Sequence, residues 1–121
     1  MPRIDVDDLL DNIVQAMTDV VNTDVKLLRG YSEVKARSIA RFTKLIAEGY
    51  ASGEIDKEEL EMELDELDGM VERFIRNMKA LVNTTIERLV HAVTSTLYAA
   101  IALAATAAGV PLPAMNMTTT G

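Results

Sequence analysis

Proline is confined to the two ends of this 121-residue chain, at Pro2, Pro111 and Pro113, and this placement is the strongest constraint on the fold. Proline interrupts helices and central strands, so the whole stretch from Arg3 to Val110 is free to form long helices. Tryptophan is absent, and most apolar side chains come from alanine, leucine, valine and methionine. Such side chains suit helices and narrow helix–helix seams. We therefore expect an all-α fold that forms a single domain over residues 1–121.

The first two helices are expected over residues 4–29 and 32–48. In both segments apolar residues recur at spacings of three and four, which is typical of a helix with one buried face. Gly30 predicts a break between them, and Ser32 is a suitable N-cap for the second helix. The glycine-flanked segment 49–53, with the sequence GYASG, predicts the turn that follows.

A third and very long helix is expected over residues 56–108. Asp56 is a good N-cap, and Glu59 stands three residues later, which is the spacing of a capping box. No glycine or proline that would end the helix appears before Gly109, apart from a single interior glycine at position 69. At a rise of 1.5 Å per residue the helix would be about 75–80 Å long.

Apolar residues along this helix alternate steps of four and three, the spacing of a left-handed coiled coil. This spacing would next place apolar residues at positions 85 and 88, which are Thr85 and Arg88, so it is interrupted there. The same spacing resumes one residue out of phase from Val82. A shift of one residue indicates that the packing partner changes near position 82. We expect the first two helices to cover the first seam, whose residues are Leu60, Leu64, Leu67, Val71, Phe74, Met78 and Leu81.

No charged side chain follows Arg88, and residues 92–110 read AVTSTLYAAIALAATAAGV. A helix that is apolar nearly all round has to be buried, and so short a chain cannot bury a projecting helix alone. We therefore expect this half of the helix to project and to form a homo-oligomer, followed by an extended tail over 109–121. The expected oligomer interface consists of Val93, Leu97, Ala100, Ile101, Leu103, Ala104 and Ala107.

A membrane protein is the main alternative, and an adaptor or regulator that buries the apolar helix in a partner protein is a further one. The uncharged segment 92–110 has nearly the length of about 20 residues that a bilayer requires. Its alanine and threonine content is less hydrophobic than that of a typical membrane-spanning helix. In this alternative the segment would anchor a small holin-like or tail-anchored protein.

Charge is distributed unevenly along the chain. The net charge is −7 and the isoelectric point is about 4.6, which argues against specific binding to nucleic acid. Residues 26–48 hold six basic and two acidic side chains, whereas residues 54–68 hold nine acidic side chains and one basic. An antiparallel hairpin would set these two segments side by side, so their charges would favour that pairing. The alternative is that both segments are solvated surfaces.

The sequence contains no arrangement that predicts catalysis. It has no cysteine, no glycine-rich phosphate loop and only one histidine, His91, which lies four residues after Glu87. We interpret this pair as a polar contact on a helix surface, and the carboxylates of residues 58–68 as a solvated acidic face. Arg73, Arg76, Lys79 and Arg88 form a basic band that we likewise assign to the helix surface. The expectation is a non-enzymatic protein without catalytic residues, cofactor or metal.

Two stretches carry a resemblance to a known group of proteins: GYASGEIDKEELEMELDEL at 49–67 and TTIERLVHAVTSTLYAAI at 84–101. Both resemble segments of small helical virion proteins of tailed bacteriophages. The resemblance covers about a third of the chain and includes no catalytic motif. It implies a structural protein of the capsid, neck or tail that is present in several copies and contacts other virion proteins. Outside a virion, the expected locations are the cytoplasm or a membrane.

Overall fold

The computed structural model describes residues 4–79 and 81–110, and these residues form four α-helices and no strand. The all-α prediction is therefore confirmed. Residues 1–3, 80 and 111–121 lie outside the described residues, and most of the expected tail is among them. The elements in chain order are α1 (Val6–Val21), the short 3-10 helix η1 (Val25–Leu27), α2 (Glu33–Ser52), α3 (Lys57–Arg76) and α4 (Asn83–Ala107).

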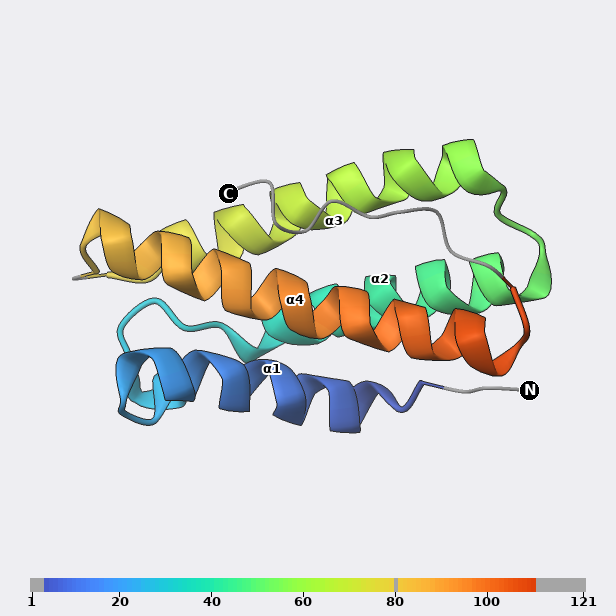
Figure 1. Cartoon of the computed structure of the whole chain (residues 1–121). Helices are drawn as coiled ribbons and strands as arrows, with labels where there is room; N and C mark the ends of the chain where they lie inside the picture. The colour runs from blue at the N-terminus through green and yellow to red at the C-terminus, as the bar shows by residue number, and fades with distance from the viewer. Residues whose placement is uncertain (1–3, 80, 111–121) are drawn as a thin grey trace.

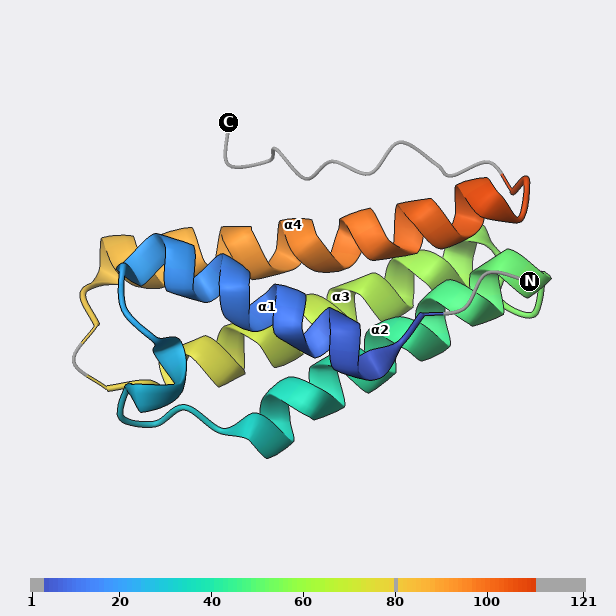
Figure 2. The same cartoon turned by 90° about the horizontal axis from the view of Figure 1, so that it is seen from below.

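Successive helices run antiparallel and form a bundle (Figure 1). α4 packs against the other three helices, and α1 and α3 lie on opposite sides of the α2–α4 pair (Figures 1 and 2). The α1–α2 and α3–α4 connections share one end of the bundle, and the α2–α3 turn lies at the other end with the C-terminal end of α4. All four helices contribute to one continuous hydrophobic core.

Polar caps explain where three of the helices begin. The Asp5 carboxylate accepts hydrogen bonds from two backbone N–H groups in the first turn of α1, and the Ser32 hydroxyl accepts one from the N–H of Lys35. Asp56 and Glu59 form the predicted capping box at the start of α3. These side chains satisfy N–H groups that have no partner within the helix, so each start is fixed locally.

The first helix is shorter than the predicted range of 4–29, because α1 ends at Val21. Asn22 adopts a left-handed conformation with φ of 59°, which stops the helix. The Asp24 carboxylate then accepts a hydrogen bond from the N–H of Lys26 and begins η1. This turn brings Val25 into the core, where it is fully buried.

The second helix extends beyond the predicted end at residue 48 and finishes at Ser52. Gly49 remains helical, and the side chain of Ile55 packs directly over it, in space that a Cβ atom would occupy. The chain reverses at Gly53, whose φ of 85° favours glycine. The turn is therefore narrower than the predicted segment 49–53.

The single helix predicted over 56–108 is instead two helices, α3 and α4, and α4 folds back along the bundle without projecting. No proline or glycine causes the break. The connection is held by a tertiary contact, in which the backbone N–H of Lys79 donates to the carbonyl of Arg29 at 2.8 Å. Gly30 has a φ of 88° and lies against the backbone of Asn77 and Met78, so closely that a Cβ atom would be 2.3 Å from the Asn77 carbonyl oxygen.

The predicted α2–α3 hairpin is present, but charge pairing does not join its two helices in the described part of the chain. Arg37 of α2 instead forms an ion pair with Asp7 of α1. The other ion pairs there are spaced four residues apart within a helix, as for Arg76 with Glu72. Apolar packing therefore holds α2 against α3, and the charged segments are largely solvated.

Candidate interaction surfaces

α4 presents opposite faces to the core and to solvent. Its core face supplies eight buried residues: Ile86, Leu89, Val93, Leu97, Tyr98, Ile101, Ala104 and Ala105. Its solvent side carries small or apolar residues that we call the α4 outer face: Ala92, Ser95, Ala99, Ala102, Leu103 and Thr106. Leu103 is 72% exposed, and no charged side chain occurs in the helix after Arg88. The core therefore covers one side of the uncharged helix, whereas Ala99, Leu103 and Thr106 of the α4 outer face are exposed among the described residues.

The residues predicted to form the oligomer interface are divided between these two faces. Val93, Leu97, Ile101 and Ala104 lie in the core of the single chain. Leu103 and Ala107 are exposed, and Ala100 is half-buried. The prediction regarded the helix as apolar nearly all round, whereas the fold buries one side of it within the same chain.

The residues of the predicted intramolecular seam lie together along the inner side of α3 and its C-terminal continuation. Leu60, Leu64, Leu67, Val71, Phe74 and Met78 are buried, and Leu81 is half-buried. α3 packs against α2 and α4, so these two helices cover the seam, and not the first two helices as the sequence predicted.

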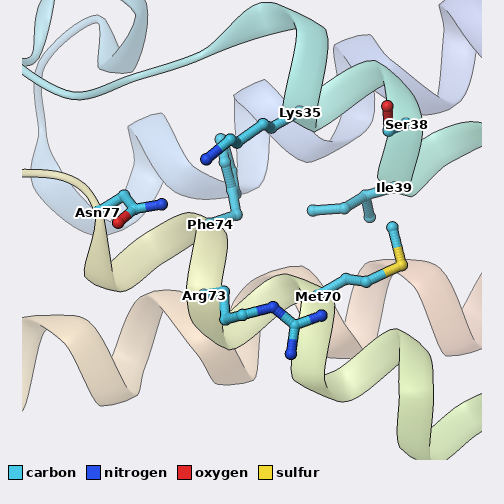
Figure 3. Close-up of a pocket in the computed structure, with 7 residues that line it drawn as sticks. All are labelled: Lys35, Ser38, Ile39, Met70, Arg73, Phe74 and Asn77. Carbon is cyan, nitrogen blue, oxygen red and sulfur yellow. The ribbon is translucent and has the colours of Figure 1, made fainter.

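A groove of about 200 Å³ runs between α2 and α3 near the basic end of the hairpin. Ile39 and Met70 point toward one another across it, and the ring of Phe74 contributes to its apolar lining (Figure 3). Lys35 and Arg73 stand at its rim, and neither forms an ion pair within the described part of the chain. The groove therefore combines an apolar interior with two available cations.

Tyr98 and Asp68 form a polar contact between α4 and α3 that the sequence does not reveal. The Tyr98 hydroxyl lies 3.0 Å from both carboxylate oxygens of Asp68, to which it donates. Burial raises the pKa of Asp68, and the hydrogen bond from Tyr98 lowers it in part. Burial beside this carboxylate also raises the pKa of Tyr98, so the hydroxyl remains a donor at neutral pH. The contact orients α4 on α3.

Tyr31 has a buried hydroxyl oxygen, and it lies beside the contact that separates α3 from α4. Its ring packs edge-on against Phe74 with centroids 5.9 Å apart, and its oxygen has no hydrogen-bond partner among the described residues. Burial raises its pKa first, followed by the charges of Glu33 and Asp24. Since the phenol stays protonated, its role is apolar packing at this end of the bundle.

His91 and Glu87 lie on the exposed side of α4, in a shallow hollow of about 590 Å³ that also involves Val20 of α1. Within residues 4–79 and 81–110, no three His, Asp or Glu side chains cluster as they would to hold a metal ion.

No protein-family model, curated protein or solved structure matches this chain. One described helix, α4, is long and apolar enough to cross a membrane by length and composition alone. In the bundle, the same helix packs against the other three.

Proposed function

We propose that this protein is a non-enzymatic structural protein that self-associates through the α4 outer face. The observation that carries the proposal is the absence of charge along this face together with the 72% exposure of Leu103. Two such faces can meet without removing any charged group from water. The removal of charged groups from water is the main cost of burying polar surface. The small side chains Ala99 and Ala102 let two helix backbones approach closely.

The geometry of α4 suits pairing with an identical helix. At 25 residues it is about 37 Å long, and its outer face extends over most of that length. Identical helices related by a two-fold axis present the same face to one another, which is the commonest arrangement of soluble homo-oligomers. In the virion setting implied by the resemblance described above, such contacts would join several copies within a capsid, neck or tail and leave other surfaces for neighbouring virion proteins.

A membrane anchor is the second candidate, and the length and apolarity of α4 favour it. Insertion would require α4 to leave the bundle, and the eight residues of its core face would go with it. Removing that many buried side chains would expose the cores of α1, α2 and α3 to water. Self-association makes no such demand on the bundle.

The test compares Leu103→Glu with Leu27→Glu by light scattering coupled to size exclusion, in buffer without detergent. Both leucines are exposed, at 72% and 80%, so neither variant disturbs the core. We expect Leu103→Glu to lower the mass of the assembly at equal concentration, because it buries a carboxylate in the interface. Leu27→Glu, which lies outside α4, should leave the mass unchanged.

Two outcomes would overturn the proposal. One is a wild-type protein that is monomeric over the whole accessible concentration range. The other is a Leu103→Glu variant with the same mass as the wild type. Recovery of the wild-type protein in the membrane pellet would instead support the anchor.

A further inference from the structure

The exposed side of α3 has an ordered arrangement that the proposed function does not use. Met62, Glu66, Gly69 and Arg73 follow one another at steps of four, three and four, so they lie along one face of the helix. Met62 is 67% exposed, and Glu66 and Arg73 are also exposed. We call these four residues the α3 outer face.

The charges of this face are antisymmetric about its centre. The apolar Met62 and the acidic Glu66 precede Gly69, and the basic Arg73 follows it. If an identical helix is laid antiparallel across the face near Gly69, Glu66 of each copy meets Arg73 of the other. A two-fold axis produces each contact twice, so a single favourable pair is doubled.

Both charged side chains of this face are available to a second molecule. Glu66 and Arg73 form no ion pair within the described residues, whereas their neighbours Glu72 and Arg76 pair with one another. A Cβ atom at Gly69 would lie 3.2 Å from a guanidinium nitrogen of Arg73, so this side chain lies back over the glycine. The missing side chain at Gly69 therefore leaves room for the guanidinium to lie close to the helix near the centre of the face.

The groove between α2 and α3 provides the complement to Met62. In the antiparallel register that pairs Glu66 with Arg73, Met62 of one copy stands opposite Asn77 of the other. Asn77 lines the groove together with the apolar side chains Ile39 and Phe74 (Figure 3). The flexible thioether side chain of methionine suits an irregular apolar groove of about 200 Å³.

We propose that a second copy of this chain docks antiparallel on the α3 outer face, with Glu66 paired to Arg73 and Met62 seated in the α2–α3 groove at both ends of the contact. This inference does not rest on self-association through α4, because it uses a different helix and a different chemistry. If both faces pair, each copy has two self-complementary interfaces, and copies join into an extended assembly and not only into dimers.

The test is a charge reversal with rescue, in a Leu103→Glu background that removes the α4 outer face. The variants are Glu66→Arg, Arg73→Glu and the double reversal, and the matched control is Glu61→Arg, an exposed carboxylate of α3 that lies off this face. The dimer dissociation constant is measured by sedimentation equilibrium at low salt. Helix content by circular dichroism verifies that each variant is folded.

We expect each single reversal to weaken the dimer at least about tenfold, because it places like charges together at two symmetric contacts. The double reversal restores complementarity and should return the dissociation constant to that of the background protein, as should Glu61→Arg. Added salt should weaken the background dimer. A background protein that stays monomeric, or a folded double reversal that remains as weak as the single variants, would overturn the inference. Neither result would bear on the mass change that Leu103→Glu causes in the wild type.

Discussion

At the scale of single residues, the contact between Tyr98 and Asp68 is the clearest example of chemistry that serves the fold. A half-buried carboxylate would be costly without a donor, and the phenol hydroxyl supplies one at 3.0 Å. The two residues belong to helices that the sequence predicts as one continuous rod, on which they would be too far apart to meet. Their hydrogen bond is therefore a direct signature of α4 folding back on α3.

This contact predicts a specific dependence of stability on pH. The pKa of Asp68 is raised above 3.8 in the folded protein, so the folded state holds the proton to higher pH than the unfolded chain does. The free energy of unfolding therefore falls as pH rises through the window that begins at 3.8. Tyr98→Phe removes the donor that lowers this pKa, so it should enlarge the fall. Asp68→Asn removes the titrating group, so it should reduce the fall.

Urea unfolding of the two variants and the wild type between about pH 4 and pH 7 measures these profiles. Glu61→Gln removes an exposed carboxylate from the same helix and serves as the control for the loss of one charge. Profiles for Tyr98→Phe and Asp68→Asn that change in the same direction would contradict the assigned contact.

At the scale of helices and their connections, the approach of Gly30 to the α3–α4 connection explains why the long helix is divided. The Arg29 carbonyl accepts the N–H of Lys79, and Gly30 lies against the Asn77 backbone. A helix continuing through position 79 would direct that N–H to a carbonyl of its own preceding turn. The tertiary contact replaces that bond, and α4 begins at Asn83.

Gly30→Ala tests this explanation against Gly53→Ala. Both glycines have positive φ, at 88° and 85°, so both substitutions carry a similar backbone cost of about 1 kcal/mol. A Cβ atom at Gly30 would also lie 2.3 Å from the Asn77 carbonyl oxygen, whereas nothing lies within 4 Å of one at Gly53. We expect Gly30→Ala to lower the free energy of unfolding by about 2–4 kcal/mol. Equal losses for the two variants in urea unfolding would contradict the close contact.

Local signals in the sequence predicted most helix starts. The features of the fold that these signals did not predict depend on tertiary contacts. Ser32, Asp56 and Glu59 act on N–H groups a few residues away, so their capping roles were visible without a structure. The division of 56–108 into α3 and α4 depends on Arg29 and Gly30, far away in sequence, and no local pattern includes them. The one-residue shift of the seam near position 82 was the only sign of this division in the sequence. It marked a change of direction in the chain.

The same distinction between local signals and tertiary contacts applies to the candidate surfaces. The uncharged nature of α4 was evident from the sequence, but the assignment of Leu97 and Ile101 to the core required knowledge of which side faces the bundle. The α2–α3 groove was not predicted, because its lining comes from two helices whose relative register the sequence leaves open. The four-three-four spacing of Met62, Glu66, Gly69 and Arg73 was present in the sequence and could have identified the α3 outer face.

At the scale of the whole molecule, the four helices form a bundle with a single continuous core, so assembly is not required to bury the C-terminal helix. The self-association that we propose therefore rests on two outward faces of a folded unit, and not on an unburied rod. The α4 outer face offers apolar contact without charge, and the α3 outer face offers complementary charges around a groove. A small unit with two such faces suits a structural protein present in many copies.

The most direct test of self-association through α4 is a distance between copies, measured by pulsed electron paramagnetic resonance. The chain has no cysteine, so His91→Cys gives a single spin label at an exposed position beside the α4 outer face, where the label does not separate two packed helices. Because the α4 helices of two copies would pack against one another, we predict a well-defined distance between labels on neighbouring copies that Leu103→Glu abolishes. A label at this site that reports no neighbouring copy, under conditions where the protein is soluble and folded, would contradict the account.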